Sequence, residues 1–456
     1  MIKFTKKIAL CSAVVITSLL STSCGGNSSK NSYSNEMGIN SGDININVDT
    51  NLNLKNVNIS FWNPITGPDA TYMQELVKQF NDAYEGKIKV NVDSQAEDSH
   101  YQRILTSFTD NSTADLTMIH KSRVAAFHRS NKLRDMTKII EEQGIKKEDY
   151  VGDLWDSGVF DNKMYAMAYD VLPMVIYYNR NLIPEGYTEE MILSEDFTLD
   201  TMLEMMKKAY IDAPMPSKRT YGMAFNYGYT ENMFMSFLVQ QGVKAVEENN
   251  PLEPTYACQA GYDAAEAVRS IPLTTNDAGK KVSSESGADH LNTFVQGRAL
   301  FTIDGIWSAP NACKKTDRVD AGVALFPKIN SSVERKVFGD GHSLVMFNNK
   351  NVSSEKDQAI SIFVKYLIDN TAVWCKGGKV AALESVAANE EYNKLEWGYL
   401  STKLEKIESP TKVYTYDTIT SPIGEWVSKL CEGTETDVKH CIDAAAKAGK
   451  EAASVL

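Results

Sequence analysis

The chain has 456 residues, of which 43% are hydrophobic, and its 59 acidic against 47 basic residues give a formal net charge of −12. This acidic balance argues against nucleic acid and anionic lipid as partners, because both attract basic surfaces. The length exceeds one ordinary hydrophobic core, so we expect two domains or lobes.

The N-terminus has the pattern of an export signal. Three lysines within residues 1–7 precede an apolar run of thirteen residues at 8–20. A helix of that length reaches about 20 Å, which is short of the roughly 30 Å of a hydrocarbon core. We therefore expect residues 1–23 to be a signal peptide rather than a membrane span.

The residues around Cys24 resemble a bacterial lipobox. Small residues, Thr22 and Ser23, precede the Cys, although Leu20 stands one place further upstream than usual. Acylation of Cys24 would anchor the protein stably at the cell surface, on the outer face of the cytoplasmic membrane. The alternative is cleavage by the ordinary signal peptidase, with Cys24 incidental.

Residues 24–56 are expected to form a flexible tether behind this anchor. Asn, Ser and Gly fill eighteen of the 32 positions from 25 to 56. A segment of this composition cannot bury enough apolar surface to order itself.

From Val57 onward, predicted strands and helices alternate. Strands are predicted at 57–62, 87–92 and 115–120, and helices at 71–84, 101–108 and 124–128, the first helix capped by Asp69 or Thr71. This alternation predicts parallel strands with crossover helices, and so a doubly wound α/β lobe. Ligands of such a lobe bind outside the carboxyl ends of the strands, which selects the loops 62–69, 94–98 and 120–123.

The cysteines and histidines give no sign of a metal or redox site. The five cysteines beyond the export region have scattered spacing, which is no disulfide framework, although Cys431 and Cys441 can form one bridge. The six histidines show no ligand spacing and H-E-x-x-H is absent. We therefore expect neither a metal nor a cofactor.

Several segments, taken in order, resemble the extracellular solute-binding proteins of carbohydrate ABC importers, the maltose-binding-protein-like group. They are FWNPITGPDATYM, DLTMIHKSRVAAF, MAYDVLPMVIYYNRNLI, FVQGRALFTIDGIW, GDGHSLVMF with AISIFVKYLI, and WCKGGKVAALESV. The resemblance implies an α/β, type II periplasmic-binding-protein-like fold, with two doubly wound lobes joined by a hinge. It also implies a monomer that captures a sugar between the lobes and delivers it to the ABC permease subunits in the membrane.

The same resemblance places the lobe boundaries. The N-terminal lobe is expected to comprise 57–168 plus 343–375, and the C-terminal lobe 169–342 plus 376–456. The chain would cross between the lobes near 168–175, 338–345 and 371–379.

A sugar-binding cleft needs aromatic planes for the CH faces of a sugar and polar groups for its hydroxyls. Trp62 ends the first strand, and Trp307 ends the DGIW turn that delivers a stacking Trp in the resembling family. We expect these two indoles to hold the sugar from opposite sides. The full set of expected ligand-binding residues is Trp62, Asn63, Asp69, Gln95, His120, Arg123, Tyr169, Asp170, Asn226, Tyr227, Asp304, Trp307, Asp340 and His342.

Most of these residues also have a structural interpretation. Trp62 can close the lobe's core, and Asp304 can cap a turn. Asp340 and His342 can stabilise a turn at the two glycines beside them. The aromatic loop FNYGYTEN, which contains Asn226 and Tyr227, can equally be buried. At most one of Tyr177 and Tyr178 can face the cleft, because neighbouring strand residues point to opposite sides.

Two other classes of function stay open. A secreted carbohydrate-active enzyme would need two carboxylates roughly 5 to 10 Å apart. No hydrolase signature such as G-x-S-x-G stands out, and no P-loop is present, so we expect the protein not to be an enzyme. The second alternative is a binding protein for a solute other than a sugar, such as a peptide, a polyamine or a metal chelate.

Overall fold

A computed structural model of the chain describes residues 44–49, 51–215, 218–284, 289–348 and 352–456. Their contacts group 44–456 into one compact unit. The expected signal peptide and the expected lipidation site Cys24 lie outside the described residues. Within the described ranges, no helix is both long enough and apolar enough to cross a membrane.

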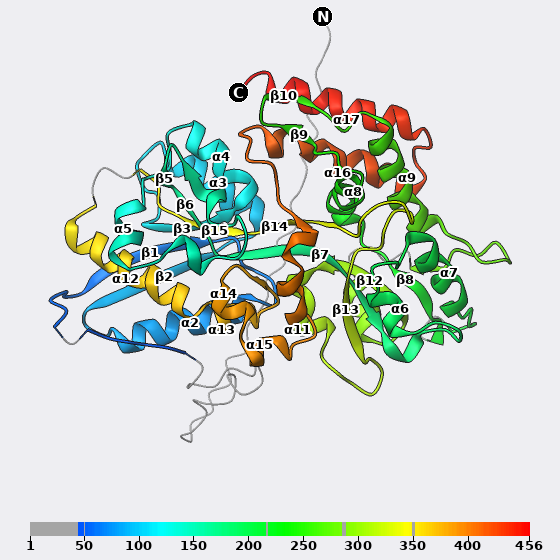
Figure 1. Cartoon of the computed structure of the whole chain (residues 1–456), viewed down its shortest axis with the longest axis horizontal. Coiled ribbons are helices and arrows are strands. Elements are labelled where there is room, and N and C mark those ends of the chain that lie inside the picture. Colours follow the sequence, from blue (N-terminus) through cyan, green and yellow to red (C-terminus); the bar gives the residue numbers. More distant parts are fainter. Residues whose placement is uncertain (1–43, 50, 216–217, 285–288, 349–351) are drawn as a thin grey trace, which may run out of the picture. The chain divides into compact units, whose positions relative to one another are not determined.

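A five-stranded sheet in the order β2-β1-β3-β15-β6 carries the N-terminal part of the unit (Figure 1). β1 runs parallel to β2 and β3 with helices between them, as the alternation in the sequence predicted. β15 enters from much later in the chain and pairs antiparallel with β3 and β6. The strands are β1 (Val57–Asn63), β2 (Ile88–Ser94), β3 (Leu116–His120), β6 (Ala166–Ala168) and β15 (His342–Val345), and the accompanying helices are α2 (Ala70–Ala83), α3 (Glu97–Ser107), α4 (Lys121–Arg129), α5 (Thr137–Glu142), α12 (Ser354–Asp369) and α13 (Thr371–Cys375).

Helix α2 shows why the sequence folds in this way. Its residues Met73, Leu76, Val77 and Phe80 recur at spacings of three and four and are all buried. This period places them on one face of a helix, which packs against the sheet. The Phe80 ring contacts Phe363 of α12 at 4.9 Å between centroids, so the core joins segments that are distant in sequence.

An eight-stranded sheet in the order β11-β8-β12-β7-β14-β17 carries most of the remaining chain, and β13 and β16 also pair with β7. All ten residues of β7 are buried, since the strand is paired along both edges. The strands are β7 (Asp170–Asn179), β8 (Tyr221–Ala224), β11 (Ser283–Ser284), β12 (Ala299–Gly305), β13 (Ala321–Leu325), β14 (Val337–Asp340), β16 (Val380–Ala381) and β17 (Ile407–Glu408).

Helices and the hairpin at 246–254 surround this second sheet, whereas the hairpin at 159–164 lies beside the first sheet, where Phe160 packs on its core (Figure 1). α7 begins after Thr198, whose hydroxyl accepts a hydrogen bond from the Thr201 N–H at 3.3 Å, as a cap should. The helices are α6 (Glu189–Leu193), α7 (Leu199–Ala209), α8 (Thr230–Gln240), α9 (Gln259–Leu273), α10 (His290–Val295), α11 (Ala309–Ala312), α14 (Glu384–Ala387), α15 (Glu390–Asn393), α16 (Tyr416–Glu432) and α17 (Val438–Ala453), and the hairpins are β4 (Val159–Phe160) with β5 (Lys163–Met164) and β9 (Val246–Glu247) with β10 (Asn250–Pro254).

The chain passes between the two sheets at 168–170, at 340–342 and at 375–380. Since the described chain forms a single contact unit, the lobe boundaries expected from the sequence stay a prediction. One buried carboxylate lies at these passages. Asp170 accepts hydrogen bonds from the His342 backbone N–H (2.7 Å), from His342 Nδ1 (2.8 Å) and from Trp374 Nε1 (2.8 Å).

We call this group the Asp170 junction, because it joins the passages at 168–170 and 340–342 to Trp374, in the helix that leads into the third passage. Burial alone would raise the pKa of Asp170, but the charge and hydrogen bonds of His342, together with the charge of Lys379, lower that pKa to about 2. The carboxylate is therefore ionised throughout the physiological range.

The structure corrects the C-terminal boundary of the tether expected at 24–56. Asn45 exchanges two hydrogen bonds with Asn370, at 2.6 and 2.8 Å, and the Tyr84 hydroxyl donates to the Asn47 carbonyl at 3.2 Å. Leu52 and Leu54 are buried. These alternate residues give the segment an apolar side that packs on the protein. The polar composition of the segment as a whole does not reveal this side.

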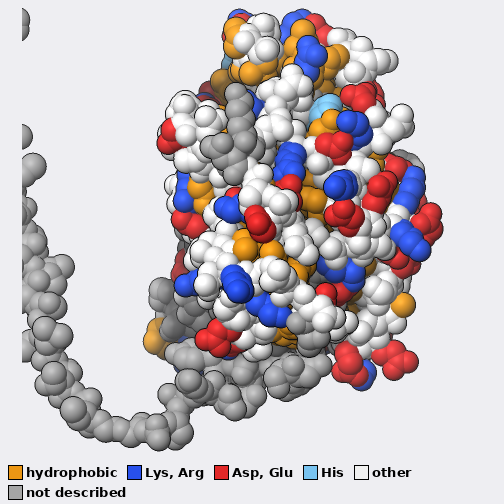
Figure 2. All heavy atoms as spheres, turned by 90° about the vertical axis from the view of Figure 1, so that its left-hand side faces the viewer, with side chains coloured by type: hydrophobic (Ala, Val, Ile, Leu, Met, Phe, Trp, Pro, Cys, Tyr) orange, Lys and Arg blue, Asp and Glu red, His pale blue; other side chains and the backbone are white. Residues whose placement is uncertain are grey.

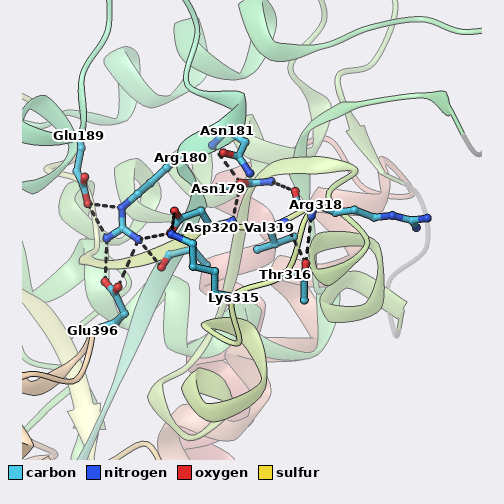
Figure 3. A network of polar contacts seen from close by, with 11 residues as sticks. Asn179, Arg180, Asn181, Glu189, Lys315, Thr316, Arg318, Val319, Asp320 and Glu396 are labelled. Carbon is cyan, nitrogen blue, oxygen red and sulfur yellow. Dashed lines mark hydrogen bonds and ion pairs between the residues drawn. The ribbon is translucent and has the colours of Figure 1, made fainter.

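An ion-pair network fastens the far end of β7 (Figure 3). The Arg180 guanidinium donates to Glu189 at 2.8 Å, to Asp320 at 3.0 Å and to Glu396 at 2.8 Å. It also donates to the Ala321 carbonyl at 2.7 Å. Arg180 thereby connects the segment after α15 to the neighbouring strands β7 and β13 of the eight-stranded sheet.

The described cysteines are free. The bridge between Cys431 and Cys441 that the sequence left open is therefore not formed. Both residues are buried, and burial raises the pKa of the Cys431 thiol to about 12. A buried neutral thiol of this kind is inert.

Candidate functional site

A cavity of about 540 Å³ receives residues from both sheets. The three loops that the topology rule selected each contribute to its lining, with Asp69 after β1, Glu97 after β2 and Arg123 after β3. This is the expected location for a ligand of an open α/β sheet. The volume lies within the usual range for small-molecule sites, about 300 to 1,000 Å³.

Aromatic rings line one wall of the cavity. Trp307 follows β12 in a short helical turn, and Tyr229 meets it edge to face at 5.7 Å between ring centroids. Phe338 and Tyr416 stack with an interplanar angle of 13°. All four rings lie on the side of the eight-stranded sheet.

Gly305 fixes the orientation of the Trp307 indole. A Cβ atom at position 305 would lie 2.0 Å from the indole ring, so only glycine leaves room for the ring to fold back over the strand end. The Tyr177 hydroxyl donates to the Gly305 carbonyl at 2.8 Å and holds this turn from below.

A buried ion pair forms another part of the wall. Lys379 Nζ lies 2.6 Å from Asp69 Oδ2, and both residues are buried. Asp69 precedes α2 but makes no side-chain capping bond. Its carboxylate is bound to Lys379 instead, which joins the loop after β1 to the passage before β16.

Arg123 and two carboxyl groups approach one another across the cavity. Arg123 Nε lies 3.0 Å from Asp417 Oδ2. Burial raises the pKa of Asp417 to about 6, with Asp340 adding to the rise and Arg123 opposing it. Burial also raises the pKa of Glu231 to about 7, despite its hydrogen bond with the Thr420 hydroxyl.

Two imidazoles complete the polar lining. The His120 and His342 rings lie 5.1 Å apart, and the Tyr101 hydroxyl bonds His120 Nδ1 at 2.8 Å. Burial lowers the pKa of His120, which favours the neutral ring. Within the described part of the chain, no group of three or more His, Cys, Asp or Glu side chains is placed to hold a metal ion.

Six of the residues expected from the sequence line this cavity: Asp69, His120, Arg123, Trp307, Asp340 and His342. The structure thus brings together side chains from two sheets that are up to 273 positions apart, from Asp69 to His342. The other eight expected residues lie elsewhere.

Trp62 is one of those eight, and its position corrects the expectation of two opposed indoles. It is buried in the hydrophobic core of the five-stranded sheet with Tyr101, Ile104 and Phe127. The Arg103 guanidinium lies 3.7 Å from the ring centroid. Trp62 therefore closes the core, and the pair of Trp62 and Trp307 across a sugar is not formed.

Asn63 and Gln95 serve the loops after β1 and β2. The Asn63 carboxamide oxygen accepts the Ile65 N–H at 3.0 Å, and its side chain is fully buried. Gln95 donates to Asp93 at 3.3 Å. Both residues shape the turns behind the cavity instead of lining it.

Tyr169 and Asp170 are buried at the passages between the sheets. Tyr169 stacks on Trp374 at 5.8 Å and donates to the Leu367 carbonyl at 3.3 Å. Asp170 is enclosed in the junction described above. Tyr177 and Tyr178 are likewise both buried, so neither faces the cavity.

Asn226, Tyr227 and Asp304 lie close to the cavity but outside its lining. The Asn226 carboxamide accepts the Gly228 N–H at 2.9 Å, and Tyr227 packs edge to face on Phe225. Asp304 is buried against His290 at 2.7 Å. For Asn226 and Asp304, a local partner uses the polar group that was assigned to the ligand.

The expected set omitted several of the lining residues: Glu97, Tyr229, Glu231, Lys379, Tyr416 and Asp417. Tyr229 and Glu231 belong to the FNYGYTEN loop that the sequence did identify, two to five positions beyond the residues chosen. Asp417 and Lys379 come from segments for which the sequence carried no signal of proximity.

Three comparisons with known proteins identify the family and the fold. The family model described as bacterial extracellular solute-binding protein matches residues 75–396. The diacetylchitobiose binding protein DasA of Streptomyces coelicolor is 24% identical over 131 residues, which is 29% of this chain and 29% of that protein. The match thus spans less than a third of the relative.

Among solved structures, the GacH receptor of Streptomyces glaucescens, described unliganded and with acarbose, has a TM-score of 0.71 at 15% identity, covering 88% of this chain and 99% of its own. Maltose-bound MalE3 of T. maritima has a TM-score of 0.72 at 18% identity, covering 88% of this chain and 100% of its own. These likenesses confirm the predicted type II periplasmic-binding-protein fold.

Proposed function

Because the chain belongs to the bacterial extracellular solute-binding proteins, we propose that it captures a sugar of oligosaccharide size in the cavity and delivers it to an ABC permease. The relative in Streptomyces coelicolor is named for diacetylchitobiose, and the similar structures include complexes with acarbose and maltose. A sugar is the solute class that these proteins share, which supports the same class for this chain.

The observation that carries the proposal is the fixed Trp307 ring within a lining drawn from both sheets. Trp307 and Tyr229 offer flat apolar faces for the CH side of a sugar ring. Arg123, His120 and Asp340 surround them with donors and acceptors for hydroxyl groups.

The proposed mechanism is closure around the ligand. A sugar that touches both sheets makes more contacts when they approach, so its binding favours the closed arrangement by that difference in free energy. The closed form then docks on the permease. The sugar leaves chemically unaltered, so the protein is proposed not to be an enzyme, and it acts as a monomer anchored through Cys24 at the cell surface.

Titration calorimetry with a panel of oligosaccharides tests the proposal, with Trp307→Ala as the diagnostic variant. We expect Trp307→Ala to lower sugar affinity at least tenfold, about 1.4 kcal/mol, because the stacking plane is lost. The matched control is Trp426→Ala, whose indole contacts His440 outside the cavity and whose loss should leave affinity unchanged.

Two results would contradict the proposal. One is a thermal shift with spermidine or peptides and none with any saccharide, since a ligand at a hundred times its Kd stabilises by about 2.7 kcal/mol. The other is the release of reducing ends from an oligosaccharide, which would make the protein a hydrolase.

A further inference from the structure

The charges that line the cavity are unbalanced. Its carboxyl groups are those of Asp69, Glu97, Glu231, Asp340 and Asp417, against the two cations Arg123 and Lys379. Lys379 forms an ion pair with Asp69 at 2.6 Å, so these two charges balance each other. Arg123 is therefore the one lining cation of the described chain that is left for the other four carboxyl groups.

Arg123 compensates this group only in part. It contacts Asp417 at 3.0 Å, whereas Glu97 is 4.0 Å away. Asp340 receives backbone N–H donors from Gly341 at 2.8 Å and from Ser122 at 3.2 Å.

Glu231 has the least compensation. Within the residues that the structure describes, it makes no ion pair, and its polar contact is the hydrogen bond with Thr420. Lys121 is not a lining residue; its ammonium group donates to Ser409 at 2.8 Å, and its charge interacts with that of Asp340 and not with Glu231.

A second observation concerns a tyrosine of the same cavity. The hydroxyl of Tyr416 is buried and has no hydrogen-bond partner among the described groups, although Tyr416 lines the cavity. Leaving a buried hydroxyl unsatisfied is unfavourable, because it loses its hydrogen bonds to water and gains none in return. Glu231, Asp340 and Asp417, which line the cavity, act electrostatically on this phenol together with Glu408, so its unpartnered donor lies among the acids of the site.

The excess of acids in the cavity, five against two bases, is proportionally larger than in the whole chain, where 59 acidic residues stand against 47 basic ones. On the face shown in Figure 2, Lys and Arg side chains are intermixed with those of Asp and Glu. Exposed acids of the described chain often pair with neighbouring bases, as Asp82 does with Lys78 at 3.0 Å. The excess of carboxyl groups in the cavity therefore calls for a local cause.

We propose that the sugar bound in this cavity carries a protonated amine, which lies between Glu231 and Asp417 and faces the aromatic wall. Carboxylates supply the opposite charge, and the rings of Trp307 and Tyr229 present the negative faces that attract an ammonium group. An amino sugar with at least one free amino group combines this cation with the hydroxyls of a saccharide. The inference rests on the proposed function, because it specifies the chemistry of the same ligand.

A neutral or an anionic ligand fits these groups less well. A neutral sugar leaves the half-buried carboxyl groups of Glu231 and Asp417 without an added counter-charge, although it covers them from water. The raised pKa values of Glu231 (about 7) and Asp417 (about 6), both caused first by burial, show that the ionised forms are disfavoured there. An acidic sugar would add a repelling charge.

The test compares two disaccharides that differ in one feature. Chitobiose carries free amines and diacetylchitobiose carries neutral amides on the same skeleton, and maltose serves as a second neutral ligand. We expect calorimetry at pH 7 to give at least tenfold tighter binding for chitobiose, and the preference to weaken when salt is raised. Glu231→Gln should lower chitobiose affinity about tenfold and change the binding of neutral sugars by less than twofold.

The matched control is Glu425→Gln on α16, because Glu425 pairs with Lys429 in solvent. That variant should bind all ligands as the parent does. Equal or tighter binding of diacetylchitobiose or maltose would overturn the amine inference and leave the proposed function standing. Failure to bind any saccharide, with or without binding of spermidine, would overturn both.

Discussion

The substitution Lys379→Met removes the charge from the buried pair with Asp69. Lys379 Nζ is 2.6 Å from Asp69 Oδ2 and also lies 4.9 Å from the Trp374 ring centroid. Methionine keeps most of the side-chain volume, so the change leaves Asp69 buried without its partner. Breaking a buried pair from one side costs about 3 to 5 kcal/mol, and the lost contact with the ring adds about 0.5 to 1 kcal/mol.

We therefore expect Lys379→Met to lower the free energy of unfolding by about 4 kcal/mol. The entropy of unfolding is about 2.1 cal/mol/K per residue. The unit of about 410 residues therefore has a total entropy of unfolding of about 0.9 kcal/mol/K. The melting temperature should then fall by about 4 to 5 °C in differential scanning calorimetry.

Two companion variants make this prediction refutable. Lys394→Met removes an exposed lysine that pairs with Glu391, and such surface pairs contribute at most about 1 kcal/mol. The double variant Asp69→Leu/Lys379→Met should recover at least half of the loss, because no uncompensated charge then remains. A single-variant loss below about 1 kcal/mol, or a double variant no more stable than the single one, would show that the pair is hydrated and contributes little.

Two further predictions concern the Asp170 junction and the network at the end of β7. The pKa of Asp170 is lowered to about 2 in the folded protein from an ordinary value of 3.8, so its stabilisation is complete above about pH 4 and is lost as the pH falls toward 2. Asp170→Asn should therefore be less stable than the parent in urea at pH 6, with a smaller difference at pH 2.5, and a constant difference would argue against an ionised Asp170. Arg180→Met should cost about 1 to 2 kcal/mol, since three partly exposed carboxylates lose their shared cation. This loss should shrink in 1 M NaCl, and a loss that is independent of salt would assign it to packing instead.

The fold could be read from the sequence because local patterns and the resemblance agree on it. The period of Leu76 and Phe80 predicts α2, the alternation around Val57 predicts β1, and the order of these elements predicts a doubly wound sheet. The tether was read from composition alone, which cannot detect that Leu52 and Leu54 share one side.

The site could be predicted only where it depends on strand ends. Asp69 and Arg123 follow the carboxyl ends of β1 and β3, and these positions are visible in the sequence. Trp62 occupies a similar position, but both faces of a sheet of this kind are covered by helices, so a large side chain next to Phe61 can be enclosed as well. Glu231 and Asp417 depend on how α8 and α16 approach the cavity, which no local pattern encodes.

The Asp170 junction has a consequence for the way in which the molecule moves. One ionised carboxylate bonds His342 of the second connecting segment and Trp374 next to the third, so these segments cannot slide past one another without breaking charge-assisted bonds. We expect the two sheets to move relative to each other by rotation about this point. A ligand that draws the sheets together would then change one angle.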